Sequence, residues 1–277
     1  MVHSKIIVKL KDIMMKKITL YTSLFAAAIM LFSACKKEAD KTANFVASDE
    51  STAYVRVIHA APSFRSIFNA PDSFNVYVND IKMNAPFLTY ASVFPASTTA
   101  FGYVAVQPGL NQFRVNIHGF ASASPDSTRL INFSKVFQAG EYYTLLLTDS
   151  IKSQRDSSQM FLKDAYTKPL NGNYGLRFVH AVWNDTAGKT IDVFSARRNA
   201  NIYTNIKPGQ ISTFNSLAAN TQLSDTLYVR RSGTLINLAQ LNGVSFANQR
   251  SYTLFYRGNG DLATGTKARA LATYLHN

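Results

Sequence analysis

The sequence predicts an all-β protein made of two tandem immunoglobulin-like β-sandwich domains that follow a lipoprotein signal peptide. Three observations support this prediction. An apolar N-terminal run ends at the only cysteine, short segments rich in β-branched and aromatic residues alternate with turn residues, and one half of the chain repeats motifs of the other. No window shows a sustained helical period of apolar residues, which favours strands over helices throughout.

The N-terminal segment has the parts of an export signal. Residues 18–32 are apolar and uncharged, and Lys16 and Lys17 precede them. A basic start, a short apolar run and small residues at the cut are typical of a secretory signal. The run is about 15 residues long, short of the roughly 20 that a membrane-spanning helix needs.

Cys35 directly follows this run. The segment Leu31-Phe32-Ser33-Ala34-Cys35 resembles the lipobox of bacterial lipoproteins, in which the cysteine thiol is lipidated and becomes the first residue of the mature chain. The resemblance implies that residues 1–34 are removed and that Cys35 carries the lipid. The alternative is an ordinary signal peptide with an incidental cysteine. Because the start at Met14 or Met15 would be conventional, we interpret the printed start as too early.

Residues 35–52 are polar and small, and we expect them to form a lipidated flexible tether. The run Lys36-Lys37-Glu38 resembles the charged signals that follow the cysteine in Bacteroidota lipoproteins. It implies an outer-membrane lipoprotein that faces the periplasm or the cell surface. Stable anchoring needs more than one acyl chain, a condition that a triacylated cysteine meets.

The composition narrows the function classes. Residues 1–34 hold five of the 29 basic and one of the 16 acidic residues, so the remaining chain carries 24 minus 15, or +9. A basic surface favours polyanions, but these charges are dispersed along the chain, and an exported protein is not expected to bind nucleic acid. A single cysteine excludes an intramolecular disulfide and a cysteine metal cluster.

An internal repeat sets the domain organisation. Three pairs of segments recur in the same order, at offsets of 121, 105 and 109 residues: 54–60 with 175–181, 130–133 with 235–238, and 143–146 with 252–255. Offsets that drift by a few residues are expected where loops differ in length. We therefore predict a first sandwich over residues 53–168 and a second over residues 169–277.

Each copy is expected to contain about seven short strands. In the first copy they lie near residues 54–60, 74–79, 99–106, 111–118, 130–137, 142–149 and 159–164. Turn sequences such as Asn79-Asp80 and Lys207-Pro208-Gly209 separate the strands in both copies. Regularly spaced short strands are typical of a β-sandwich.

The opening segments resemble a known family. Val55-Arg56-Val57-Ile58-His59-Ala60-Ala61-Pro62 is followed by Asn75-Val76-Tyr77-Val78-Asn79-Asp80. The pair resembles the Val-Arg-Val-x-His-Ala-Ser-Pro and Asp-Val-Tyr-Val-Asn-Gly motifs of the bacterial exported domain-of-unknown-function 4397 family. The second copy is more degenerate, with His180-Ala181-Val182-Trp183 and then Asp192-Val193-Phe194. The resemblance covers nearly all of residues 53–277 and implies a β-sandwich in the cell envelope, without an established activity.

Four residues of the repeated opening strand form a structural motif, namely Arg56, His59, Arg177 and His180. Alternation places each histidine on the apolar face and each arginine on the other face. We interpret the histidines as bonding nearby backbone at the end of a core strand, and the arginines as bridging to a carboxylate or to loop carbonyls. The alternative is that the histidines carry chemistry.

The only tryptophan, Trp183, falls in the loop after the first strand of the second copy, beside Asn184 and Asp185. This polar setting suits stacking on a sugar ring, and loops at the end of a sandwich are common recognition surfaces. The three residues are therefore a candidate ligand site. The alternative is that Trp183 caps the core or packs between the two domains.

No local motif of a metalloprotease, a serine hydrolase or a calcium loop is present. We therefore predict no catalytic residue, no metal ligand and no cofactor. The expected function is a non-catalytic binding, adhesion or scaffolding module of the envelope, held to the membrane by its lipid and facing a glycan or an envelope protein. The alternatives are a glycan-directed hydrolase with a site built from loops, and a purely structural envelope protein.

Overall fold

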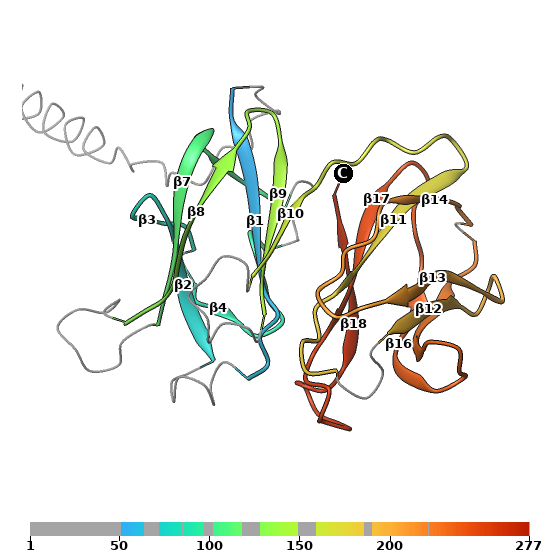
Figure 1. Cartoon of the computed structure of the whole chain (residues 1–277). Helices are drawn as coiled ribbons and strands as arrows, with labels where there is room; N and C mark the ends of the chain where they lie inside the picture. The colour runs from blue at the N-terminus through green and yellow to red at the C-terminus, as the bar shows by residue number, and fades with distance from the viewer. Residues whose placement is uncertain are drawn as a thin grey trace, which may run out of the picture. The chain divides into compact units, whose positions relative to one another are not determined.

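The computed structural model describes residues 51–63, 72–84, 86–96, 102–117, 128–148, 159–185, 190–220 and 222–276. All regular elements in this part of the chain are β-strands, β1 to β18 (Figure 1). This confirms the prediction of an all-β fold made of sandwich-like domains. Residues 1–50, with the expected signal peptide and Cys35, lie outside the described residues.

No helix among the described residues has the length and apolar character that crossing a membrane requires.

The first ten strands build two sheets. They are β1 (Ala53–His59), β2 (Ser73–Val78), β3 (Ile81–Lys82), β4 (Leu88–Thr89), β5 (Val93–Phe94), β6 (Val104–Val106), β7 (Gly109–Ile117), β8 (Thr128–Phe137), β9 (Tyr142–Leu147) and β10 (Met160–Lys163). One sheet has the order β10-β9-β1-β5, and β6 also pairs with β1. The other has the order β3-β2-β7-β8, and β4 also pairs with β2. We call this pair of sheets the first sandwich.

The remaining strands build two further sheets, which we call the second sandwich. They are β11 (Asn173–His180), β12 (Ile191–Ser195), β13 (Ala200–Ile206), β14 (Asn215–Ala218), β15 (Asp225–Arg231), β16 (Asn237–Val244), β17 (Ser251–Arg257) and β18 (Ala270–Leu275). Their orders are β14-β11-β17-β18 and β13-β12-β15-β16. Within the described residues, no sheet combines strands of both sandwiches.

The two sandwiches share one topology and one register. In each, the opening strand runs parallel to the next-to-last strand, as β1 with β9 and β11 with β17. Arg56 pairs with Thr144 in the first, and Arg177 pairs with Thr253 in the second. Equivalent residues can therefore be assigned from the strand registers rather than from sequence identity.

These registers correct one segment of the predicted repeat. Val115 and Val229 are equivalent, because they pair with the equivalent residues Val76 and Val193. Val115 also pairs with residue 131 of β8, and Val229 pairs with residue 239 of β16. The offset between β8 and β16 is therefore 239 minus 131, or 108, and not 105. Leu235 and Ile236 instead lie in the turn before β16, where they are 82% and 52% exposed. Aliphatic residues such as these are common in strands, so the sequence pattern assigned them to one, although both side chains are exposed.

Three apolar clusters hold the described residues together. One core lies between the sheets of each sandwich. The third joins outward-facing side chains of β1, β9 and β10 to those of β11, β17 and β18, and includes Ile58, Leu146, Val179 and Phe255. All seven residues of β1 are consequently buried, because both faces of the strand are covered.

Candidate functional site

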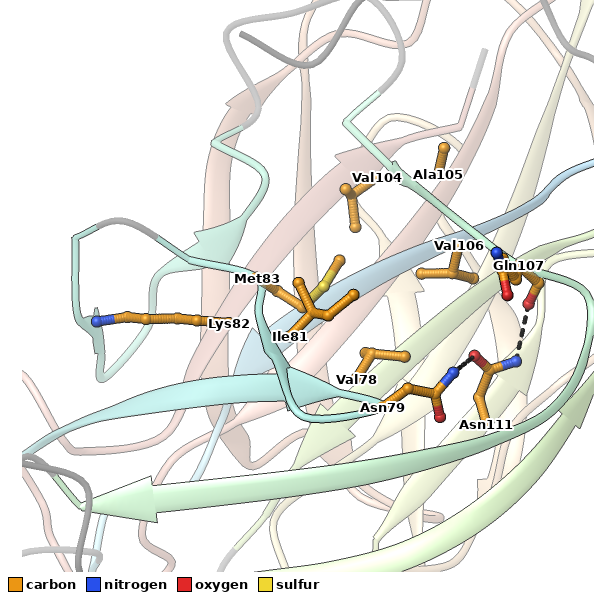
Figure 2. Close-up of a pocket in the computed structure, with 10 residues that line it drawn as sticks. All are labelled: Val78, Asn79, Ile81, Lys82, Met83, Val104, Ala105, Val106, Gln107 and Asn111. Carbon is orange, nitrogen blue, oxygen red and sulfur yellow. Dashed lines mark hydrogen bonds between the residues drawn. The ribbon is translucent and has the colours of Figure 1, made fainter. Parts of the chain in front are cut away.

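A cleft opens in the first sandwich between the edges of its two sheets. Its volume is about 400 Å³, within the range of about 300–1,000 Å³ that ligand sites occupy. Strands β2 and β3 with the turn between them form one wall, and β6 with the start of β7 forms the other (Figure 2). Its lining residues are Val78, Asn79, Ile81, Lys82, Met83, Val104, Ala105, Val106, Gln107 and Asn111.

The lining combines aliphatic walls with an amide rim. In Figure 2 the side chains of Met83, Val104 and Val106 gather in the cleft, while the Lys82 side chain points away from it. Asn79 Nδ2 at the rim donates to Oδ1 of the buried Asn111 at 2.8 Å, and Asn111 Nδ2 donates to the Gln107 carbonyl at 2.8 Å. Such a lining suits an apolar group that carries one or two polar atoms.

The shape of the first wall follows from local sequence. Asn79 and Asp80 both have positive φ angles, 48° and 63°, which suits the two-residue turn between β2 and β3. The buried Asn84 side chain then bonds the backbone of β2 in place of a continuing strand, accepting from Val76 N at 2.7 Å and donating to Phe74 O at 3.2 Å. Strand β3 therefore ends after two residues, and Met83 follows it.

The second sandwich closes the equivalent space with a tyrosine. In the first sandwich Met83 lies opposite Val76, since its amide donates to the Val76 carbonyl at 2.8 Å. In the second sandwich Tyr203 pairs with Val193, the equivalent of Val76. Met83 and Tyr203 therefore occupy equivalent positions. The Tyr203 hydroxyl crosses between the sheets and donates to the Leu176 carbonyl. Burial raises the pKa of Tyr203, so its hydroxyl remains a neutral donor.

Two further bonds link the same sheet edges in the second sandwich. Asn215 Nδ2 donates to the Ile202 carbonyl at 3.4 Å, and Arg198 Nη2 donates to the Ala218 carbonyl at 2.6 Å. The equivalent of Asn215 is Val104, because each pairs with the same position of the opening strand. The aliphatic side chain of Val104 cannot make the bond that Asn215 makes. The bond of Arg198 also has no counterpart, because Arg198 lies in a four-residue turn and the first sandwich has a two-residue turn at that place.

The candidate ligand residues Trp183, Asn184 and Asp185 lie together at one end of the second sandwich. Trp183 is 37% exposed, and its indole covers the predicted turn at Gly209. A Cβ added to Gly209 would lie 3.0 Å from Trp183 Cη2, which explains why a glycine with φ of +79° sits there. The matching loop of the first copy covers residues 62–70, after its opening strand. Residues 64–70 of that loop lie outside the described part of the chain.

The polar neighbours of Trp183 bond to the loop that follows β17. Asn184 Nδ2 donates to Asn259 Oδ1 and Asp261 Oδ2, at 2.5 and 2.9 Å, and Asn184 Oδ1 accepts from Gly260 N at 2.9 Å. The buried Asp185 accepts from the Tyr256 hydroxyl at 2.8 Å and from Arg269 at 2.9 Å. These bonds fix the loop, so the exposed part of the indole is what this group offers to a ligand.

Arg177 reaches from the second sandwich to the first. Its guanidinium forms an ion pair with the buried Asp164, donates to the Lys163 carbonyl at 3.2 Å and bonds Thr253 Oγ1 at 3.0–3.1 Å. It lies 4.7 Å from the centre of the Phe214 ring. The arginine thus bridges to both a carboxylate and a backbone carbonyl.

Arg56 makes the reciprocal reach from the first sandwich. Its Nη2 donates to the Leu275 carbonyl at 2.9 Å, and its Nε donates to Gly102 O at 2.6 Å. It lies 4.2 Å from the centre of the Tyr103 ring. Leu275 and Lys163 occupy the same register position, opposite Tyr252 and Tyr143. Each arginine therefore bonds the other sandwich's last strand at an equivalent carbonyl.

The residues after these two carbonyls, Asp164 and His276, are also equivalent and meet in a buried network. The Tyr103 hydroxyl bonds Asp164 Oδ2 at 2.9 Å and His276 Nδ1 at 2.6 Å. Thr144 donates to the same carboxylate oxygen at 2.6 Å, and Thr253 Oγ1 lies 2.6 Å from His276 Nε2. Sequence patterns gave no sign of this network, although extending the repeat to its last strand would have aligned the acid with the histidine.

Thr253, His276 and Asp164 form a hydroxyl–imidazole–carboxylate series like that of a nucleophilic enzyme. Three features oppose that chemistry. All three residues are at most 3% exposed, the threonine oxygen also accepts from Arg177, and the imidazole is 4.0 Å from the carboxylate. A substrate cannot reach the Thr253 hydroxyl. Because Asp164 belongs to the first sandwich and Thr253 and His276 belong to the second, these three residues instead join the two sandwiches.

The two motif histidines differ in their partners. His59 Nδ1 accepts from Ala61 N at 3.3 Å, and its Nε2 lies 3.5 Å from Asp72. His180 packs edge-on against Tyr256, and its Nδ1 has no hydrogen-bond partner among the described residues. Burial lowers the pKa of His59 and lowers that of His180 to about 4, so both are neutral near pH 7.

The described residues contain no group of three or more histidine, cysteine, aspartate or glutamate side chains placed to hold a metal ion.

Comparison with known proteins gives distant structural similarities. One is to a family CBM26 carbohydrate-binding module from Eubacterium rectale Amy13K in complex with maltoheptaose, at 11% identity and a TM-score of 0.22, covering 80% of this chain and 96% of that one. Another is to a candidate adhesin from Bacteroides ovatus, at 9% identity and a TM-score of 0.21, covering 82% and 99%. At these values neither ligand nor role carries over to this chain.

A search of curated proteins finds no match. The family described as "Domain of unknown function (DUF4397)" matches residues 53–187. The matched segment includes the opening motif, the whole first sandwich and its cleft, and β11 with the Trp183 loop. Through residues 53–187, the chain belongs to the DUF4397 family.

Proposed function

We propose that the protein is a non-catalytic binding module of the cell envelope, anchored by a lipid on Cys35, which holds its partner in the cleft of the first sandwich. One observation carries the proposal: of two equivalent sheet edges, one is closed by Tyr203 and the other opens into a space of about 400 Å³. Aliphatic walls that face water leave apolar surface exposed, so covering them with a partner is favourable.

The interface between the sandwiches supports this division of roles. A buried ion pair and a third apolar cluster join them. The second sandwich thereby acts as a scaffold that fixes the cleft walls formed by the first. A site on a rigid framework loses less conformational entropy when it binds than a site on mobile loops.

The cleft chemistry favours a protein partner over a glycan. Its lining residues include no aromatic side chain on which a sugar ring could stack, and its walls are aliphatic. The glycan-binding alternative relies on the exposed part of Trp183. The hydrolase alternative would require a second, accessible set of polar groups, since the Thr253–His276–Asp164 series is enclosed.

Site-specific photo-crosslinking in the intact cell tests the binding role. A photoreactive phenylalanine analogue replaces Ile81, which is 69% exposed at the cleft. The matched control is Ala200, an exposed residue at the same register position of the second sandwich. We expect one discrete adduct from position 81 and none from position 200. Adducts that are absent from both, or identical at both, would refute a cleft-specific role.

The anchor is tested separately by metabolic labelling with palmitate. We expect the native chain to incorporate label and the Cys35→Ala variant to incorporate none. Equal labelling of the two chains, or no labelling of either, would remove the lipid anchor and with it the proposed membrane location.

A further inference from the structure

We infer that the cleft accepts an extended polypeptide segment that adds to the outer edge of β6 and inserts one aromatic side chain, preferably tyrosine, between the two sheets. This inference rests on the proposed binding function and specifies its ligand. The second sandwich provides the template for the inserted side chain, because there the equivalent space is filled by a tyrosine of β13, a strand that itself pairs with β12 in the opposite sheet.

The template defines the aromatic side chain. Tyr203 is 6% exposed, its ring stacks on Phe178 at 5.9 Å, and its hydroxyl bonds the Leu176 carbonyl. The equivalent of Leu176 is Val55, whose partner in β6 is Val104, a lining residue of the cleft. A tyrosine entering the cleft would therefore meet aliphatic walls first and a backbone carbonyl at its far end.

The edge of β6 can bond the backbone of such a segment. The Tyr54 amide donates to Glu141 O, so the backbone of Tyr54 points toward β9 and away from its partner Ala105. The N–H and C=O groups of Ala105 then also point away from β1, toward the outer edge. Ala105 is exposed and lines the cleft, and within the described residues β6 pairs with β1 alone.

The outward-pointing backbone of β6 and the space for a tyrosine together match strand addition. In that mode of binding, main-chain bonds supply affinity and a pocket for alternate side chains supplies specificity. The Gln107 side-chain amide lies at the rim, where it can bond the segment beyond the inserted side chain, whereas both amide atoms of Asn79 already bond Asn111 and Gln112. A sugar would use the rim without filling the aliphatic walls, and an acyl chain would fill the walls without using the rim.

The chain offers a natural reporter for this test. From Cys35 to Asn277 it contains two methionines, Met83 in the cleft and Met160 in the apolar cluster between the sandwiches. Methyl-labelled methionine in the lipidated chain, held in a lipid nanodisc, should therefore give one signal that responds to the cleft and one that serves as an internal control.

The probe is the synthetic peptide Ala-Asn-Ile-Tyr-Thr-Asn-Ile, which copies β13. We expect it to shift the Met83 methyl signal in a saturable manner and to leave the Met160 signal in place. The same peptide with alanine in place of tyrosine should bind at least about tenfold more weakly, since it loses the buried ring. In fluorescence anisotropy, the closed variant Met83→Tyr with Val104→Asn should lose binding of the labelled tyrosine peptide.

The outcomes separate the inference from the proposed function. If both peptides bind equally, or if maltoheptaose or decanoate shifts Met83 while the peptides do not, the inference is wrong and the cleft remains a binding site. If no probe shifts Met83 and position 81 gives no adduct in the cell, both fail. If the closed variant unfolds, Val104→Asn alone replaces it, with the unchanged Met160 signal as evidence of folding.

Discussion

The two sandwiches have the same strand order, yet their equivalent edges differ. In the second, Tyr203, Asn215 and Arg198 tie one sheet to the other across the edge. In the first, Met83 and Val104 occupy two of these positions and leave a cleft. The comparison teaches that an internal repeat can supply its own reference, since one copy shows how the fold closes the edge that the other copy leaves open.

The interface between the sandwiches shows the opposite pattern, because there the two copies match. Arg56 and Arg177 each bond the equivalent carbonyl of the other sandwich. The match fails at one pair, where Asp164 faces its counterpart His276. Charge is therefore balanced around Arg177 by a carboxylate, while Arg56 is held mainly by carbonyls and an aromatic ring.

The largest expected effect comes from breaking that asymmetric interface. Replacing Arg177 with methionine leaves the buried Asp164 carboxylate without its cation, which should cost about 3–5 kcal/mol of unfolding free energy. Replacing Arg56 with methionine leaves carbonyls without a donor and should cost about 1–3 kcal/mol. Urea unfolding of both variants measures the difference. Equal losses would show that the carboxylate does not distinguish the two arginines.

The next effect tests whether the second edge is closed by packing. Tyr203→Ala removes a buried ring and its cross-sheet bond, and should cost about 3 kcal/mol. Met83→Ala removes a partly buried side chain beside an existing cleft, and should cost about 1 kcal/mol. The same urea titration measures both. A larger loss for Met83 than for Tyr203 would contradict the assignment of the open and closed edges.

Acid should destabilise the fold through its buried histidines, two of which, His180 and His276, belong to the second sandwich. Burial lowers the pKa of His276 to about 3 and that of His180 to about 4, against an ordinary value of 6.5. The folded state therefore binds fewer protons than the unfolded state between these values, and unfolding free energy is full above pH 6.5 and falls as the pH drops toward 3. Urea midpoints between pH 7 and pH 4 should show this decline.

The control for this acid effect is His180→Phe, which keeps an aromatic ring against Tyr256 and removes one titrating group. We expect it to flatten part of the decline below pH 6.5. A profile that is flat in the native chain, or a decline that the variant leaves unchanged, would show that His180 does not stay neutral in the folded state.

Local patterns in the sequence predicted the strands well. All seven strands expected in the first copy are present, and the Asn79-Asp80 turn is where expected. Strand β6 is shorter than predicted, because it begins at Val104 and residues 102 and 103 are not part of it. The two-residue strands β3, β4 and β5 were missed, because they are too short to produce an alternating pattern. Alternation placed Arg56 and Arg177 off the core face, but it did not identify the carbonyls and the carboxylate that they bond.

The cleft and the network could not be predicted in the same way. Asp164, Tyr103 and His276 are brought together from positions up to 173 residues apart, and none lies in a recognisable motif. The cleft depends on a difference in side-chain length and bonding at Met83 and Val104, whose apolar character fits a core strand equally well. Only the registers reveal that Tyr203 and Asn215 stand at the matching positions.

The smallest expected effect on the cleft comes from replacing Trp183. Because its ring is 37% exposed and covers Gly209, Trp183→Ala should cost only about 1 kcal/mol of unfolding free energy. It should leave binding of the tyrosine peptide unchanged, since Trp183 is not among the residues that line the cleft.

The intrinsic tryptophan fluorescence of the native chain, measured while oligosaccharides are added, provides the second measurement, because Trp183 is the only tryptophan in the chain. If an oligosaccharide quenches this fluorescence and also displaces the peptide, the two sites are coupled and the closed sandwich is more than a scaffold. If it quenches without displacing the peptide, the indole is an independent sugar-binding surface, and the division of roles between the sandwiches must be revised.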